Sequence, residues 1–306
     1  MSQVKFTVFS DLHHHPAWYK VEAPERLRTI QERAAAAGSQ FLLHLGDFTH
    51  KPSAAGELIR QYREFPIPGY FVLGNHEFDI DSAEKVLECY GLERGYYSFD
   101  VSGFRFVVLD ENYFCDFPGI CFHYSERNYF DHPDGRDWMP PEEIDWLRET
   151  VLTSPYPCIL SSHAPIDYYD GVNGVACKEA IRPIIAESQK TPGRVILCMN
   201  GHYHRSGLDL IDGVYRLDVN SASFNWVPKP HSFFPAEWYK QYECVGNQVT
   251  YSDPLSANVT IDSDSGTIGI EGVRSSFVCD VSTEKSGNIS TFRPCLPEML
   301  SATVRF

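Results

Sequence analysis

The sequence predicts an α/β protein, because short apolar runs alternate with segments rich in helix formers. Val4–Phe9 is apolar and rich in β-branched and aromatic residues, and a polar turn begins at Ser10. Ala23–Ala37 is rich in helix formers, and Gly38 is a natural helix stop. Phe41–Leu45 is a second apolar run. This order favours helices layered on a sheet.

The same alternation continues along the chain. Further helices are predicted at residues 53–64, 81–90, 141–152 and 178–189, and further strands at 70–73, 158–161 and 195–199. Paired strands are expected at 96–100 and 104–110, around the turn Ser102-Gly103, and a second hairpin at 207–219. Pro183 must lie in the first turns of its helix or kink it.

Two regions break the pattern. Residues 112–140 are irregular and rich in aromatics, Asp and Pro, which predicts a long loop or cap insertion. Residues 223–306 begin as an aromatic-rich loop and end in a β-rich portion, in which 255–270 and 273–281 alternate like strands. Since no linker-like break separates these parts, we expect residues 1–306 to form a single domain.

Charge and hydropathy limit the partners. The formal net charge of −15 disfavours duplex nucleic acid, whereas small phosphorylated molecules stay possible because bound cations can dominate the local field. No apolar stretch is long enough to span a membrane, and the N-terminus shows no secretory signal, so a cytoplasmic location is expected. The nine cysteines are scattered without a C-x-x-C pair, which predicts reduced thiols, including Cys115 and Cys121.

Five short polar blocks each follow an apolar strand. In chain order they are Asp11-Leu12-His13, Gly46-Asp47, Gly74-Asn75-His76-Glu77, His163 and Gly201-His202-Tyr203-His204. Ligand sites in α/β sheets collect at the carboxyl ends of the strands, so the five blocks can converge on one crevice. Asp, Asn and His without thiolates suit Mn, Fe, Zn or a similar ion. Each block alone is weak evidence, but five in this order predict a metal site.

Together these blocks resemble the signature of the calcineurin-like metallophosphoesterase superfamily, over about two thirds of the chain. The resemblance implies a four-layer α/β/β/α sandwich of two mixed sheets flanked by helices. It also implies two metal ions in one site. One ion would be held by Asp11, His13, Asp47 and His204, and the other by Asp47, Asn75, His163 and His202. The Asp47 carboxylate would bridge the two ions.

The implied function is hydrolysis of a phosphate ester by in-line attack of a metal-bridging hydroxide. His76 would act on the leaving-group oxygen or the developing charge. Glu77 either orients His76 or is a carboxylate that lies on the surface or forms hydrogen bonds behind the ligands. One position departs from the family: His50 stands three residues after Asp47, where many members carry Asp. This puts a carboxylate supporting the catalytic histidine in doubt.

Substrate contacts are predicted less sharply. His14, Arg205 and His231 are candidates for the pocket, with Arg127 as a further phosphate contact, although histidines and arginines in loops are commonly ordinary surface groups. The preferred function is a phosphodiesterase acting on small or nucleotide-like molecules. A phosphomonoesterase with the same site is the alternative. A metal-stabilised binding protein without activity is disfavoured, because none of the seven expected ligands is missing.

Overall fold

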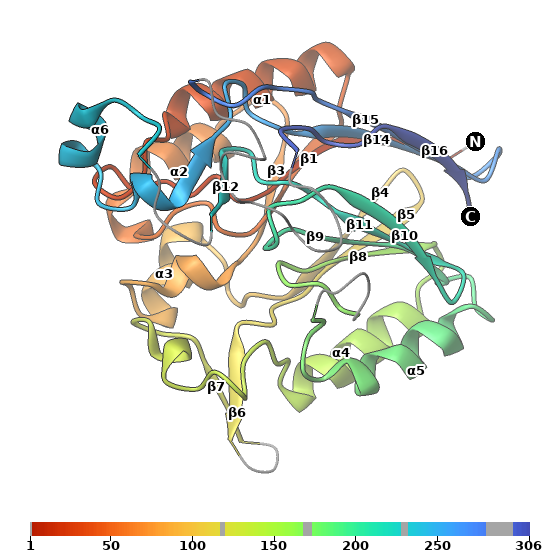
Figure 1. Cartoon of the computed structure of the whole chain (residues 1–306). Helices are drawn as coiled ribbons and strands as arrows, with labels where there is room; N and C mark the ends of the chain where they lie inside the picture. The colour runs from red at the N-terminus through yellow and green to blue at the C-terminus, as the bar shows by residue number, and fades with distance from the viewer. Residues whose placement is uncertain (1, 117–119, 168–172, 228–231, 280–295) are drawn as a thin grey trace.

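Two six-stranded sheets lie face to face between two groups of helices in the computed structural model of the chain (Figure 1). The structure describes residues 2–116, 120–167, 173–227, 232–279 and 296–306. Both sheets contain parallel and antiparallel neighbours. The predicted sandwich of two mixed sheets with flanking helices is therefore confirmed. Within the described ranges, no helix combines the length and the apolar character that crossing a bilayer requires.

The first sheet has the order β16-β15-β14-β1-β2-β3. Its strands are β16 (Ala302–Arg305), β15 (Thr267–Gly272), β14 (Ala257–Asp262), β1 (Gln3–Phe9), β2 (Phe41–Leu45) and β3 (Gly69–Val72). β1, β2 and β3 are parallel, while β14 and β15 run antiparallel to their neighbours. Parallel strands end at the same edge of a sheet, so the turns after β1, β2 and β3 lie next to one another.

The second sheet has the order β10-β11-β9-β8-β5-β4. Its strands are β10 (Gly207–Ile211), β11 (Val214–Asp218), β9 (Val195–Asn200), β8 (Cys158–Ser161), β5 (Phe104–Val108) and β4 (Tyr97–Val101). The four central strands are parallel, so the ends of β8 and β9 lie together as well.

Alternation along the strands explains the four layers. Phe41, Leu43 and Leu45 of β2 point into the core between the sheets, whereas Leu42 points to the outer face. The outer face of the first sheet is covered by α1 (Ala23–Ala37), α2 (Gly56–Arg63) and α3 (Ala83–Tyr90). The outer face of the second sheet is covered by α4 (Pro141–Leu152) and α5 (Lys178–Ser188) (Figure 1).

Most predicted elements appear with close boundaries, and α1 ends as predicted because Gly38 adopts a left-handed φ of 70°. The predicted helix at 53–64 is divided, with a 3₁₀ turn at Pro52–Ala54 followed by α2. Pro183 lies inside α5, whose first residue is Lys178. The prediction of a strand at 273–281 is wrong for its described residues, 273–279, which form only isolated bridges. β16 takes the edge position beside β15 instead.

The two irregular regions contain small elements. Residues 112–140 include the hairpin β6 (Tyr113–Asp116) and β7 (Ile120–His123) and a 3₁₀ turn at Asn128–Phe130. A disulfide joins Cys115 and Cys121 across the hairpin, so the prediction of reduced thiols is wrong for this pair. The two cysteines face each other in the strand register, which residue spacing alone did not reveal. The aromatic-rich region holds β12 (Phe224–Trp226), β13 (Gln248–Thr250), α6 (Ala236–Gln241) and a 3₁₀ turn at Val245–Asn247.

Candidate metal centre

Six of the seven predicted metal ligands, all but Asn75, come together where the carboxyl ends of the two sheets meet. Asp11 and His13 follow β1, Asp47 follows β2, and Asn75 opens a 3₁₀ turn after β3. The remaining three, His163, His202 and His204, follow β8 and β9 of the second sheet. The site therefore depends on the packing of one sheet against the other.

The backbone is strained at these positions. Five of the seven predicted ligands adopt a left-handed φ that L residues rarely take: Asp11 (54°), His13 (54°), Asp47 (59°), His202 (69°) and His204 (49°). Such residues typically cost about 1–3 kcal/mol each, and they cluster at functional sites where the surroundings enforce them. The blocks after β1, β2 and β9 thus turn sharply, and the turns aim these side chains inward.

Glycines permit the close approach of the ligand loops. Gly46 has a left-handed φ of 92°, and a Cβ atom there would lie 2.4 Å from Nδ1 of His163. A Cβ atom at Gly74 would lie 2.3 Å from Oδ1 of Asp47. A side chain at either position would push the turns apart, which accounts for the glycines that begin these two blocks.

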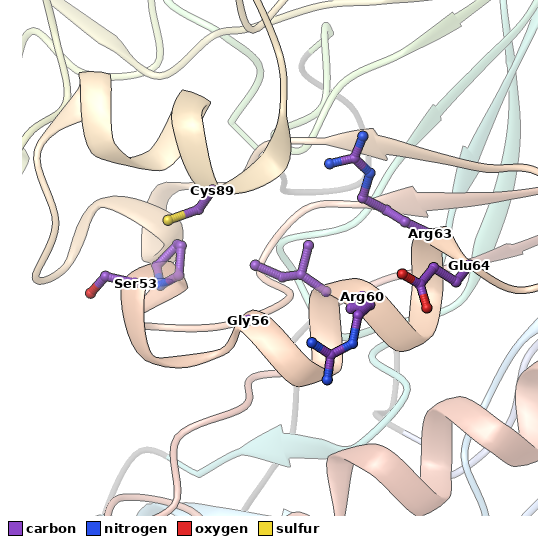
Figure 2. Close-up of a pocket in the computed structure, with 8 residues that line it drawn as sticks. Ser53, Gly56, Arg60, Arg63, Glu64 and Cys89 are labelled. Atoms are coloured by element: carbon purple, nitrogen blue, oxygen red, sulfur yellow. The ribbon is translucent and has the colours of Figure 1, made fainter.

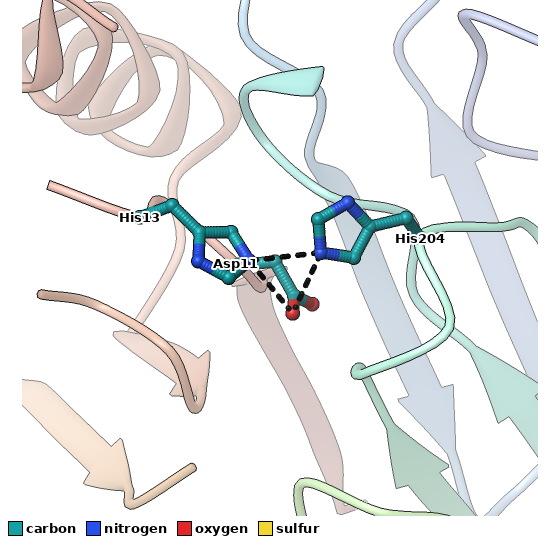
Figure 3. A group of neighbouring side chains, drawn as sticks. All are labelled: Asp11, His13 and His204. Carbon is teal, nitrogen blue, oxygen red and sulfur yellow. Dashed lines mark hydrogen bonds and ion pairs between the residues drawn. The ribbon is translucent and has the colours of Figure 1, made fainter. Parts of the chain in front are cut away.

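The first ligand group consists of Asp11, His13 and His204, all fully buried (Figure 3). Oδ1 of Asp11 lies 3.2 Å from Nε2 of His204 and 3.6 Å from Nε2 of His13. The two Nε2 atoms are 2.9 Å apart. One carboxylate oxygen and two imidazole nitrogens therefore point at a common position.

The second group consists of Asp47, His163 and His202. Oδ2 of Asp47 lies 3.0 Å from Nε2 of His163, which is 3.3 Å from Nδ1 of His202. The same Asp47 oxygen is 3.8 Å from Nε2 of His13 in the first group. Asp47 therefore stands between the two groups, as a bridging carboxylate would.

These residues fit a pair of metal ions. Oδ1 of Asp11 and Oδ1 of Asn75 are buried without a hydrogen-bond partner, which normally costs free energy unless another group, such as a cation, satisfies them. Burial lowers the pKa of His13 to about 3 and, with His163, that of His202 to about 4, so both rings are neutral, as metal ligands must be. Oxygen and imidazole donors suit Mn, Fe or Zn.

His163 is held differently. Burial disfavours its charged form, but the carboxylates of Asp47 and Asp11 outweigh this and raise the pKa of His163 well above its ordinary value. Burial likewise opposes the charge on Asp47, yet His163 and His76 hold the pKa of that carboxyl well below its usual range. His163 without a bound metal therefore favours its protonated form, and a metal ion would have to displace that proton.

His76 pairs with a carboxylate that the sequence analysis did not identify. Nδ1 of His76 lies 2.7 Å from Oδ2 of Asp79, three residues later on the same 3₁₀ turn. Burial alone would lower the pKa of His76, but Asp47 and Asp79 raise it to about 9. His76 is thus a protonated imidazole with a fixed ring. The i, i+3 spacing was the available signal, because one 3₁₀ turn brings such residues together.

Glu77 does not orient His76. Its carboxylate is fully buried and accepts hydrogen bonds from the backbone N–H groups of Asp47 (2.9 Å), Phe48 (2.5 Å) and Gly74 (2.7 Å) and from the hydroxyl of Tyr90 (3.1 Å). It therefore ties the turn after β2 to the turn after β3. Of the two interpretations of this residue, the hydrogen-bonding carboxylate matches the structure.

The substrate candidates lie in three different situations. His14 is partly buried beside His13, and its Nδ1 has no hydrogen-bond partner. Arg205 is buried, with its Nε 3.0 Å from Oδ2 of Asp218. His231 lies outside the described residues. Contact with a substrate stays a prediction for all three.

A separate cavity of about 430 Å³ lies between α2 and α3 (Figure 2). Arg60 and Arg63 of α2, Ser53 of the preceding turn and Cys89 of α3 contribute to its lining, which includes none of the seven predicted ligands. This hollow is therefore separate from the candidate metal centre.

Two mixed sheets with buried Asp and His side chains at their joined edge define a metallophosphoesterase centre. The family model described as calcineurin-like phosphoesterase matches residues 4–206. This chain belongs to the calcineurin-like phosphoesterase family. The match covers all five polar blocks.

Solved structures share the fold at low sequence identity. A dimetal phosphatase from Danio rerio superposes with a TM-score of 0.60 and 13% identity, over 91% of this chain and 99% of that one. GAP50, described as the anchor in the inner membrane complex of Plasmodium, gives a TM-score of 0.56 and 12% identity, over 100% of this chain and 89% of its own. Comparison with curated proteins gives no match. At these identities the likeness concerns the fold alone.

Proposed function

We propose that the protein is a dinuclear-metal phosphodiesterase that hydrolyses small or nucleotide-like diesters. The observation that carries the proposal is the complete ligand set, placed beside a protonated imidazole. Two buried Asp/His groups share the neighbourhood of Asp47, and the pair His76–Asp79 lies next to them. The proposed cofactors are two ions of Mn, Fe or Zn, and the proposed partner is a small phosphate ester instead of a nucleic acid duplex.

The chain's own residues have separate tasks in this proposal. Bound metal ions would hold phosphoryl oxygens and lower the pKa of an attacking water. His76 donates a proton to the leaving-group oxygen, because its Nδ1 is engaged by Asp79 and Nε2 is the nitrogen that remains. Asp79 keeps the ring in this orientation and stabilises its positive charge.

The charge around the site supports a diester over a monoester. A monoester carries two negative charges near neutral pH, and arginines commonly bind such groups. Arg205 is paired with Asp218. Arg127 is half-exposed, with its Nε 3.9 Å from Oδ1 of Asp79 and its guanidinium over the ring of Phe130, so this arginine is also paired with a carboxylate. A singly charged diester needs fewer cations beyond the two metals and His76.

Two other functions are the alternatives. A phosphomonoesterase would use the same ligands, and the shared fold of the Danio rerio dimetal phosphatase keeps this candidate open. A binding protein without activity is suggested by the fold shared with GAP50, described as an anchor. The intact ligand set disfavours this second alternative, because a binding role would not require two buried metal-binding groups.

Hydrolysis of bis-p-nitrophenyl phosphate and p-nitrophenyl phosphate by the Mn²⁺-loaded protein separates these functions. The proposal expects a higher kcat/KM for the diester, and loss of this activity in Asp47→Asn. Asp145→Asn, an exposed change on α4, is the matched control and should retain activity. A higher kcat/KM for the monoester would favour the phosphatase. Two bound metals without turnover of either ester, or of a panel of natural esters, would favour the binding protein.

A further inference from the structure

His50 stands at the one position where the sequence departs from the family pattern, three residues after Asp47. It is fully buried, and both of its ring nitrogens have partners. Nε2 lies 2.9 Å from Nδ1 of His13, and Nδ1 lies 2.7 Å from Oδ2 of Asp79. The same Asp79 oxygen is 2.7 Å from Nδ1 of His76. One carboxylate oxygen therefore joins two imidazoles, and one of these leads on to a predicted metal ligand.

The distances fix where the protons lie once a metal is bound. Nε2 of His13 faces Asp11 and His204, so this nitrogen is the one that binds a cation. Nδ1 of His13 then carries the hydrogen and donates it to Nε2 of His50. His50 must therefore be the neutral Nδ1–H tautomer, which donates in turn to Asp79. The opposite tautomer would place a hydrogen on Nε2, against the Nδ1–H of His13, and leave Nδ1 facing the carboxylate without one.

The other ligand histidines are fixed in a simpler way. Nδ1 of His163 lies 2.7 Å from the carbonyl oxygen of Leu45, and Nδ1 of His204 lies 2.7 Å from that of Phe224. A backbone carbonyl is a common partner for the remote nitrogen of a metal-binding histidine. His13 instead donates to an imidazole whose own donor ends at a carboxylate. This arrangement connects the metal side of the site with the side that protonates the leaving group.

We propose that His50 is a positioning residue that orients His13 for metal binding and Asp79 for holding His76. The proposal rests on the proposed function only for its catalytic half. The family pattern suggests a carboxylate at this position. His50 instead forms a hydrogen-bonded bridge between His13 and Asp79. Loss of the bridge should therefore disturb metal binding and proton donation together.

A purely structural role is the competing explanation. The ring of His50 packs against Tyr19, with centroids 4.9 Å apart, and against Trp18 at 5.3 Å. If His50 only filled this space, a phenylalanine of similar size would serve equally well. Phenylalanine keeps the aromatic volume and removes both hydrogen bonds, so it separates the two roles.

The test compares His50→Phe and His50→Gln with the wild-type protein by chelator-competition titration with Mn²⁺ and Zn²⁺. We expect His50→Phe to weaken binding of one of the two ions by about 10- to 100-fold. His50→Gln should recover most of this loss, because its amide can accept from His13 and donate to Asp79. Tyr19→Phe is the matched control, because it keeps the aromatic packing against His50 and leaves both hydrogen bonds of His50 in place, so it should bind both ions as the wild type does.

Turnover of the diester at saturating metal gives the catalytic readout. His50→Phe should lower kcat by about tenfold with little change in KM, because the bridge acts through Asp79 on proton donation and not on substrate binding. Wild-type metal affinity and wild-type kcat in His50→Phe would overturn the proposal. Failure of the wild-type protein to turn over any ester would instead count against the proposed function, and the metal titration would still decide the role of His50.

A measurement on the unaltered protein covers the case in which the variants fail to fold. Long-range ¹H–¹⁵N correlation spectra of the Zn²⁺-loaded protein report the tautomer of each histidine. We expect His50 to carry its hydrogen on Nδ1 and His13 to carry its hydrogen on Nδ1 with Nε2 bound to zinc. An Nε2–H tautomer at His50 would contradict the proposed bridge.

Discussion

The two sheets contribute unequally to the metal centre. The first sheet supplies both carboxylates among the predicted ligands, Asp11 and Asp47, together with the amide of Asn75 and the imidazole of His13. It also supplies the pair His76–Asp79 on the turn after β3. The second sheet supplies only imidazoles, from the turns after β8 and β9. Neither sheet alone supplies all the predicted metal ligands.

This difference has a physical consequence. Carboxylates gathered at one sheet edge repel one another when buried, and the imidazoles of the second sheet join those of His13 and His76 in compensating them. The core between the sheets contains Phe6, Leu43, Phe106 and Leu197, and its burial provides the free energy that brings the two edges together. Assembly of the site is therefore coupled to packing of the sheets. Substitutions in the first sheet and in the second sheet should therefore change different properties of the site.

Asp47→Asn should have the largest effect, because this residue lies against ligands of both sheets. We expect kcat to fall by roughly 10³-fold, since several kcal/mol of charge stabilisation depend on the bridged ions. Metal content measured by mass spectrometry should fall below two ions per chain. Retention of two tightly bound ions with normal turnover would show that Asp47 does not bridge.

His76→Ala should separate catalysis from metal binding within the first sheet. We expect kcat to fall by about 10²-fold, the usual contribution of a positioned acid, while metal content stays at the wild-type value. Asp79→Asn should reduce kcat in the same direction, because it removes the charge that stabilises the protonated ring. Loss of the metals together with turnover in His76→Ala would contradict the role given to this histidine.

Glu77→Gln tests how the first sheet holds its two turns together. The amide cannot accept from all the N–H groups that the carboxylate now satisfies, so unfolding should become easier by about 2 kcal/mol. Tyr90→Phe removes only the hydroxyl donor to Glu77 and should cost less. Denaturant unfolding of the metal-free proteins measures both. An unchanged unfolding midpoint in Glu77→Gln would show that the Glu77 carboxylate does not stabilise the two turns.

Metal binding by a histidine of the second sheet, His163, should depend on pH. Because the pKa of His163 lies above its ordinary value, metal binding must displace a proton from it at neutral pH. Metal affinity should therefore rise with pH and fall by about tenfold for each unit of acidification per proton released. Calorimetric titrations in two buffers of different ionisation enthalpy count this proton. If no proton is released, or if the same proton is still released in His163→Gln, then His163 is not the group that loses it.

Local pattern was sufficient for much of this protein. Apolar runs that stop at Ser10, Gly46 and Gly74 marked the parallel strands and placed a polar block at each strand end. Strand length and alternation are local properties, so the elements and the candidate ligands could be predicted in order. Edge strand β16 could not, because it pairs with β15 across a long stretch of sequence and none of its residues is fully buried, so no apolar run marks it.

Residue types specify which side chains could bind metal, and the strand pattern specifies the strand ends at which they stand. That His50 joins His13 to Asp79, and that Glu77 ties two turns together, follows only from how distant segments pack. The chemistry of a side chain depends on its residue type, so it can be predicted at each position separately. The partner of each group depends on turns with left-handed φ values and on two sheets meeting face to face, which no local pattern specifies.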